Sequence, residues 1–221
     1  MNYFVTGTDT GVGKTLVSCA LLHGFAAQGR RVAGFKPVAA GVDADGMNDD
    51  AKALLAAGTI QLRYEQVNPY CLREAIAPHI AAARENVRIE LPRIVAAYRE
   101  LAAQADVVIV EGAGGFRVPL NETQDSADLA RELGLPVILV AGMRLGCLNH
   151  ALLTVEAITA RGLKLAGWVA NVLNGNMPVL QDNVTALKER LAAPLLGVVP
   201  YMAQPDVRVA AAQIDFGRLG K

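Results

Sequence analysis

The chain has 221 residues, and its 21 Lys and Arg balance 21 Asp and Glu, so the formal net charge is zero. A chain of this length can bury one sizeable α/β core, and we expect residues 1–221 to form a single domain. A neutral chain without a block of Lys and Arg does not attract nucleic-acid phosphates, so we expect no nucleic-acid partner.

Short, nearly continuous apolar runs alternate with stretches of helical character along the whole chain. The apolar runs are 3–5, 32–35, 107–110, 137–141, 165–170 and 195–199. The helical stretches are 14–28, 50–57, 90–104, 125–133, 148–161 and 178–192. Fully apolar strands suit a sheet that is covered on both faces. The alternation therefore predicts a doubly wound, mostly parallel α/β sheet with helices on both faces, of the P-loop NTPase type.

The first apolar run leads into GTDTGVGKT, residues 7–15, which nearly matches the phosphate-loop template G-x-x-x-x-G-K-[ST]. Five residues instead of four separate Gly7 from Gly13, and Thr8 stands where the template has its first glycine. A strand precedes the segment and a helical stretch follows it, which is the context that a phosphate loop needs. An ordinary tight turn before a helix is the alternative.

The residue types within this loop suit the binding of a triphosphate. Gly11 and Gly13 allow backbone conformations in which successive N–H groups turn toward phosphate oxygens. Lys14 can place its ammonium group against the outer phosphates, and Thr15 can offer its hydroxyl to Mg²⁺. The loop therefore predicts ATP with Mg²⁺ as the ligand.

Charged residues follow the second apolar run. Lys36 comes directly after 32–35, so it either neutralises charge on a transferring phosphoryl group or is a surface lysine at a strand end. Asp49 and Asp50 stand where the next helical stretch begins. Either of them could cap that helix, and a ligand role toward Mg²⁺ is the alternative.

Glu111 follows the apolar run 107–110 and precedes the glycine-rich segment 112–115. A carboxylate just past such a strand lies at the carboxyl edge of the sheet, where open α/β folds bind ligands. Glu111 is therefore a candidate Mg²⁺ ligand, and an acidic residue that ends a strand in a glycine turn is the alternative.

Two later segments carry further candidates. The segment 144–154 opens a helix after a strand, and its free N–H groups near Gly146 could hold a carboxylate. Asn171 ends another strand, and its amide can donate to and accept from the edge of a base. Guanine-specific proteins usually place Asp three residues later, but position 174 is Asn, which favours adenine.

The three cysteines, Cys19, Cys71 and Cys147, are odd in number and far apart, which argues against a disulfide framework and against a zinc site. The chain starts as a strand instead of a basic segment with an apolar run, so no secretory signal is expected. The run 135–141 is far shorter than the roughly 20 residues of a membrane helix. We expect a cytoplasmic protein without membrane contact.

Taken together, these motifs resemble the dethiobiotin synthetase family, in which the lengthened phosphate loop is itself a shared trait. The matching stretches, in the order of the family, are YFVTGTDTGVGKT, AGFKPVAAG, VNPY, VEGAGG, LPVILVAGMRLGCLNHALLT, LAGWVANV and APLLGVVPY. They extend over residues 3–201, nearly the whole chain. The resemblance implies a cyclo-ligase that makes dethiobiotin from 7,8-diaminononanoate (7,8-diaminopelargonate), CO₂ and MgATP, through a carbamate and its phosphorylated anhydride.

The resemblance also implies roles for individual residues. Lys36 and Lys14 match catalytic lysines, and Thr15, Asp50 and Glu111 match the Mg²⁺ ligands. The implied nucleotide site comprises Thr10, Gly11, Val12, Gly13, Lys14, Thr15, Leu16, Asp50, Glu111, Gly112, Ala113, Gly114, Asn171, Val172, Pro200, Tyr201 and Met202. The implied substrate contacts are Lys36, Ala40, Leu145, Gly146 and Asn149. Members of the family are homodimers with the active site at the subunit interface, so the resemblance implies that the contacts at 145–149 come from the partner subunit.

Two positions depart from the enterobacterial members of the family. Gly11 stands where these have Glu, and Ala40 stands where they have a Ser that contacts substrate. The loss of the Ser removes one hydrogen bond, worth roughly 0.5–1.5 kcal/mol, so we expect activity with altered affinities.

Two neighbouring classes share the general pattern. Regulatory ATPases of the partitioning and nitrogenase type carry a second lysine in the phosphate loop, where this chain has Asp9. Glutamine-dependent amidating enzymes of the cobyrinate type need an additional glutaminase domain, for which 221 residues leave no room. The partitioning-type ATPase is the main alternative to the cyclo-ligase.

Overall fold

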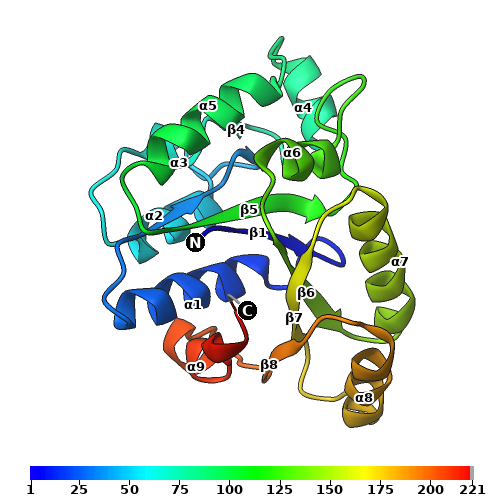
Figure 1. The fold of residues 1–221 in the computed structure, drawn as a ribbon. Helices are drawn as coiled ribbons and strands as arrows, with labels where there is room; N and C mark the ends of the chain where they lie inside the picture. The colour runs from blue at the N-terminus through cyan, green and yellow to red at the C-terminus, as the bar shows by residue number, and fades with distance from the viewer. Residues whose placement is uncertain (220–221) are drawn as a thin grey trace.

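A six-stranded parallel sheet runs through the computed structural model, which describes residues 1–219 (Figure 1). Positions 220–221 of the expected domain lie outside the described residues. The strands are β1 (Tyr3–Gly7), β2 (Val32–Phe35), β5 (Val107–Gly115), β6 (Val137–Met143), β7 (Leu165–Val172) and β8 (Leu195–Val199). Their order is β2-β5-β1-β6-β7-β8, and all pairs are parallel, so the predicted fold is confirmed.

Each predicted helix is present, with ends within about two residues of the expected ranges. These helices are α1 (Lys14–Ala27), α2 (Asp49–Ala57), α5 (Leu91–Ala102), α6 (Ser126–Leu133), α7 (Cys147–Ala160) and α8 (Leu180–Arg190). The sequence did not predict a second sheet of β3 (Val38–Ala40) and β4 (Tyr70–Leu72), the helices α3 (Tyr64–Val67), α4 (Pro78–Arg84) and α9 (Val207–Ala212), or a 3₁₀ turn (Phe216–Arg218). These elements have three to seven residues, too few for a clear periodic pattern.

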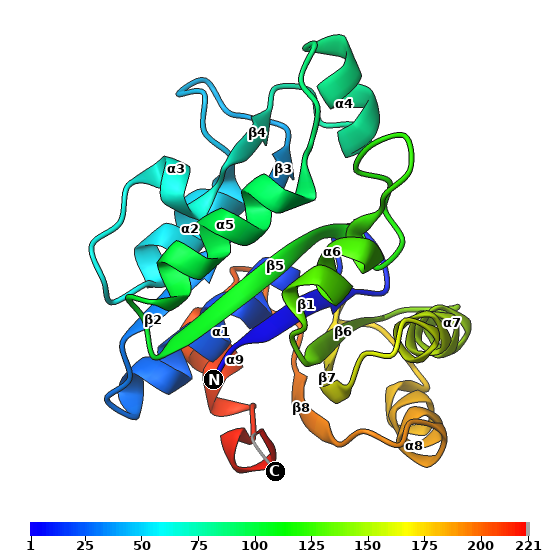
Figure 2. The ribbon, with the colours of Figure 1, turned by 45° about the horizontal axis from the view of Figure 1, so that its top comes forward.

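Alternate side chains of the strands enter hydrophobic clusters on the two faces of the sheet, because successive residues of a strand point to opposite faces. In β1, Tyr3 and Val5 pack with α1 and α9, whereas Phe4 packs with α5 and α6. Figure 2 shows α1 and α9 on one side of the sheet and α5 and α6 on the other. Since both faces are covered, fully apolar strands are stabilised over their whole length.

The strand order places the functional segments at one edge of the sheet. The chain leaves β1 toward β2 on one side, and later strands extend the sheet on the other side, which makes the carboxyl end of β1 a topological switch point. In the parallel register, Val5 pairs with Glu111 and Phe35 pairs with Val110. Lys36, one residue beyond Phe35, therefore reaches the level of Glu111.

Candidate active site

The phosphate loop connects β1 to α1 in a left-handed backbone conformation at two glycines. Gly11 has φ +72°, and Gly13, which caps α1, has φ +86°. Asn171 of β7 donates its amide Nδ2 to the carbonyl oxygen of Val12 at 2.8 Å. A Cβ atom on Gly13 would lie 2.2 Å from that nitrogen. The loop is thus fixed by a buried side chain from a neighbouring strand.

Alanine at Gly13 is expected to destabilise the protein more than alanine at Gly11. Both substitutions place a side chain in the left-handed region, which costs about 1–2 kcal/mol. Only Gly13→Ala also displaces Asn171, because the Cβ position of Gly11 has no atom within 4 Å. Urea unfolding of the two variants measures this difference, and equal losses would show that the Asn171 contact does not hold the loop.

Lys14 is a buried cation beside an open cavity. Lys14 is 7% exposed, and its Nζ donates to the carbonyl oxygen of Asp9 at 3.1 Å. Burial lowers the pKa of Lys14 below its usual value, although the nearby charge of Glu111 opposes this effect. A buried ammonium group with one neutral acceptor is well placed to bind an anion.

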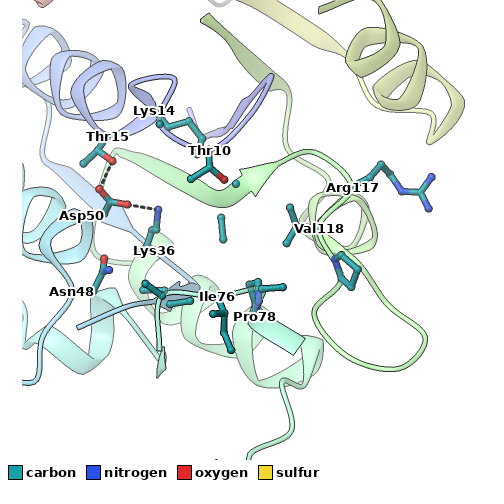
Figure 3. Close-up of a pocket in the computed structure, with 18 of the residues that line it drawn as sticks. Thr10, Lys14, Thr15, Lys36, Asn48, Asp50, Ile76, Pro78, Arg117 and Val118 are labelled. Atoms are coloured by element: carbon teal, nitrogen blue, oxygen red, sulfur yellow. Dashed lines mark hydrogen bonds and ion pairs between the residues drawn. The ribbon is translucent and has the colours of Figure 1, made fainter. Parts of the chain in front are cut away.

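Lys36 lies between two carboxylates. It is 3% exposed, and its Nζ lies 2.6 Å from Glu111 Oε1 and 3.0 Å from Asp50 Oδ2. Figure 3 shows the pair of Lys36 with Asp50, which also accepts a hydrogen bond from Thr15. Burial lowers the pKa of Lys36, but the two carboxylates more than offset this, so the pKa lies above its ordinary value. Burial raises the pKa of Asp50, yet Lys36 and the Thr15 hydroxyl bring it below its usual value. The structure thus stabilises the charged forms of Lys36 and Asp50.

Oxygen atoms from three elements meet next to this pair. The Thr15 hydroxyl lies 2.6 Å from Asp50 Oδ1 and 3.0 Å from Glu111 Oε1. Glu111 is fully buried, and its Oε2 has no hydrogen-bond partner among residues 1–219. Hydroxyl and carboxylate oxygens are the ligands that Mg²⁺ prefers, and a buried carboxylate oxygen without a hydrogen-bond partner is suited to bind a cation. Mg²⁺ is commonly held by one or two carboxylates together with the phosphates of a bound substrate, and Asp50 and Glu111 are two such carboxylates.

Two details of this cluster differ from the expectations. Glu111 is not past the strand but inside β5, which continues to Gly115 because Gly115 pairs with Gly7. The helix α2 is capped by Asn48, whose side chain accepts from the N–H of Ala51, and not by Asp49 or Asp50. Asp49 is exposed and pairs with Lys52 at 2.9 Å.

A cavity of about 800 Å³ opens next to these groups. The predicted residues that line it are Thr10, Gly11, Gly13, Lys14, Thr15, Lys36, Ala40, Asp50, Ala113 and Gly114. Sequence reasoning did not identify the further lining residues Ala39, Asn48, Ala75, Ile76, Ala77, Pro78, Arg117, Val118 and Pro119. Most of these are small or apolar and carry no motif, so only the folded chain reveals them.

Other predicted residues lie outside this cavity. These are Val12, Leu16, Glu111, Gly112, Asn171, Val172, Pro200, Tyr201, Met202, Leu145, Gly146 and Asn149. Glu111 does not line the cavity, but its Oε1 accepts hydrogen bonds from two residues that do, Thr15 and Lys36. Tyr201 is exposed after β8, and Leu145 is 99% exposed in the turn that leads into α7. The adenine and carboxylate roles of these outer residues stay predictions.

The comparisons with known proteins agree with one another. Residues 1–207 match a family model described as an AAA domain. The chain is 57% identical to the ATP-dependent dethiobiotin synthetase BioD of Aromatoleum aromaticum, over 96% of both chains. It is 56% identical to the protein of that name from Nitrosospira multiformis, over 99% of this chain and 96% of the other. The chain belongs to the ATP-dependent dethiobiotin synthetase family. It is accordingly an enzyme that uses ATP.

Solved structures of dissimilar sequence share the fold of this dethiobiotin synthetase family member. The MinC:MinD cell division complex of Aquifex aeolicus matches with a TM-score of 0.58 at 12% identity, over 98% of this chain and 87% of the other. Cell division protein FtsY of Thermotoga maritima matches with a TM-score of 0.56 at 18% identity, over 96% of this chain and 67% of the other. These similarities concern the fold alone. Within residues 1–219, no helix has both the length and the apolar character needed to cross a membrane.

Proposed function

We propose that the chain closes the ureido ring of dethiobiotin from 7,8-diaminononanoate and CO₂ at the expense of ATP. The observation that carries this proposal is the Lys36–Glu111–Asp50 cluster, which lies beside the phosphate loop and contributes Lys36 and Asp50 to the wall of a partly apolar cavity. Membership of the dethiobiotin synthetase family supports the overall reaction.

The first step joins an amine of the substrate to CO₂. The amine nitrogen attacks the carbon, and loss of a proton leaves a carbamate anion. An anion and a triphosphate repel each other, so cations must bring them together. Lys14 faces the cavity from the phosphate loop, and Lys36 faces it from the end of β2. In this proposal the two ammonium groups bring the carbamate and the triphosphate together.

The second step transfers the γ-phosphoryl group to a carbamate oxygen, and ADP leaves. Charge spreads over the oxygens of the transferring group, and Lys36 stabilises it because Glu111 and Asp50 hold its Nζ in place. In the third step the second amine attacks the carbamoyl carbon, the C–O bond to phosphate breaks, and a further proton is lost. Holding both amines in one cavity makes this ring closure intramolecular.

We also propose that Mg²⁺ binds with ATP. Thr15, Asp50 and Glu111 would hold it, since their oxygens meet within hydrogen-bond distance and Glu111 Oε2 has no partner in the described part of the chain. When bound, Mg²⁺ neutralises phosphate charge. The adenine would lie near Asn171, Val172 and residues 200–202.

A homodimer is the proposed assembly. The turn before α7 leaves Leu145 99% exposed, and Gly146 caps the helix with φ +92°. Among residues 1–219 no side chain accepts from the first N–H groups of α7, although the N–H of Cys147 donates to the carbonyl oxygen of Arg144. An exposed apolar side chain next to N–H groups without side-chain acceptors favours contact with a second copy. There, Leu145, Gly146 and Asn149 would approach the carboxylate of the substrate bound by the first copy.

Asp50→Asn is expected to raise the Mg²⁺ concentration for half-maximal activity by about tenfold or more. The amide lacks the charge that attracts the cation, and Asp50 also positions Lys36. Asp49→Asn is the matched control, because Asp49 pairs with Lys52 outside the cluster and should leave the Mg²⁺ dependence unchanged. An equal Mg²⁺ dependence of the two variants would show that Asp50 is not a ligand of Mg²⁺.

Isotope labelling tests the proposed reaction directly. The enzyme is incubated with ATP, Mg²⁺, 7,8-diaminononanoate and ¹³C-bicarbonate, and the product is analysed by mass spectrometry. We expect dethiobiotin with one ¹³C in the ureido carbon and one ADP formed per product. Unlabelled product, or ADP without product, would refute the proposed carbon source or the coupling.

A further inference from the structure

Lys36 lies where the chain leaves the main sheet. β2 ends at Phe35 and β3 begins at Val38, so Lys36 belongs to neither strand. Its N–H donates to the carbonyl oxygen of Val67 at 2.8 Å, and its own carbonyl oxygen accepts from the side chain of Asn68 at 2.6 Å. The main chain of Lys36 is therefore held by these two residues and not by a strand ladder.

Asn68 is a buried residue whose side-chain amide has only one suitable orientation. It is 3% exposed, and its Nδ2 donates to the carbonyl oxygens of Lys36 and Tyr70, at 2.6 and 3.1 Å. Its Oδ1 accepts from the hydroxyl of Tyr64 at 3.0 Å. A flipped amide would turn its oxygen toward two carbonyl oxygens, so the nitrogen must face Lys36.

The hydroxyl of Tyr64 extends this contact to the start of α2. It accepts from the N–H of Asn48 at 2.8 Å, and Asn48 caps the helix that carries Asp50. Burial raises the pKa of Tyr64 to about 12, so the hydroxyl keeps its proton at neutral pH and can donate to Asn68. Figure 3 shows Asn48 on the same side of the cavity as Lys36 and Asp50. Tyr64 and Asn68 thus connect the main chain on the two sides of the Lys36–Asp50 ion pair.

We propose that Asn68 and Tyr64 are positioning residues that fix Lys36 Nζ at the point of phosphoryl transfer. This inference rests on the proposed function, in which Lys36 stabilises the charge of the transferring group. Such stabilisation needs a cation that is in place before the reaction, and a displacement of about 1 Å can cost up to 100-fold in rate. Neither residue lines the cavity, so both act through Lys36 and not through contact with substrate.

Tyr64→Phe tests this role with little change of volume, because it removes only the hydroxyl. We expect kcat to fall by about two- to tenfold, the effect of one hydrogen bond, with the KM values for ATP and 7,8-diaminononanoate within about twofold of the parent. Asn68→Ala removes the contact with Lys36 itself and should lower kcat by about 30-fold. Phosphate release that depends on the diamine, at saturating bicarbonate, measures these rates.

Tyr98→Phe and Asn2→Ala are the matched controls. Asn2 Nδ2 donates to the hydroxyl of Tyr98 at 2.7 Å, and its Oδ1 accepts from the N–H of Val108 at 2.8 Å. This is also a tyrosine–asparagine contact that holds a main-chain group, but neither residue lines the cavity beside Lys36. Thermal unfolding should show a loss of stability in the controls, whereas their kcat should equal that of the parent.

A comparison in two backgrounds separates the positioning of Lys36 from a general structural role. In Lys36→Gln, the further change Tyr64→Phe should not lower the residual rate, since no ammonium group is left to position. An equal fold loss in both backgrounds would overturn the proposal, as would an unchanged kcat for Tyr64→Phe alone. If the parent enzyme releases no phosphate that depends on the diamine, the proposed function itself fails, and this is seen before any variant is tested.

Discussion

Lys36→Gln is expected to lower kcat by about 100- to 1000-fold while the affinity for ATP stays within a few-fold of the parent value. Lys36 Nζ is the buried cation that lies 2.6 Å from Glu111 and 3.0 Å from Asp50, at the point where the phosphoryl group would be transferred. The amide of Gln cannot carry the compensating charge. Phosphate release and equilibrium binding of ATP measure the two effects separately.

Loss of the Lys36 charge also affects stability, so a control is needed. Glu111 is fully buried, and a buried charge whose partner is removed destabilises a protein by about 3–5 kcal/mol. The double variant Lys36→Gln/Glu111→Gln removes both charges and should regain stability without regaining activity. Lys52→Gln, which removes a lysine that pairs with acidic residues at the surface, should leave the rate unchanged. A normal rate for Lys36→Gln would exclude Lys36 from the chemistry.

Lys14→Met is expected to weaken ATP binding by about 100-fold, because it removes charged hydrogen bonds to the outer phosphates. The free protein should be as stable as the parent or more stable. Burial lowers the pKa of Lys14, which means that the fold disfavours its charged form, and Met fills a similar volume without charge.

Isothermal titration with ATP and thermal unfolding without ligand test both parts of this prediction. Together, Lys14→Met and Lys36→Gln should separate binding from catalysis, since the first loses affinity and the second loses turnover. If Lys14→Met kept the ATP affinity of the parent, the phosphate loop would not bind the nucleotide through its lysine.

The sequence predicted the sheet, its main helices and the charged cluster because these depend on local patterns. Fully apolar runs identified the strands, and the end of each run marked the edge of the sheet where Lys36 and Glu111 meet. The predicted end of strand β5 at residue 110 was wrong, because a glycine-rich segment such as 112–115 usually indicates a turn. In this protein it continues as a strand through the pairing of Gly115 with Gly7.

Other features could not be predicted, since they depend on contacts between distant segments. The residues 75–78 that line the cavity carry no periodic or chemical signal. Asn171 suggested an adenine contact, yet its amide also holds the carbonyl of Val12 in the phosphate loop. Asn68 lies in the stretch VNPY, and only the fold shows that its amide holds the main chain of Lys36.

Phosphate release from MgATP, with the diamine or bicarbonate present or withheld, is the most direct measurement of the proposed cyclo-ligase activity. The predicted result is rapid release only when 7,8-diaminononanoate and bicarbonate are both present, because the carbamate must form before it can accept the phosphoryl group. Equal release with and without the two substrates would contradict a synthetase and would instead indicate a simple ATPase.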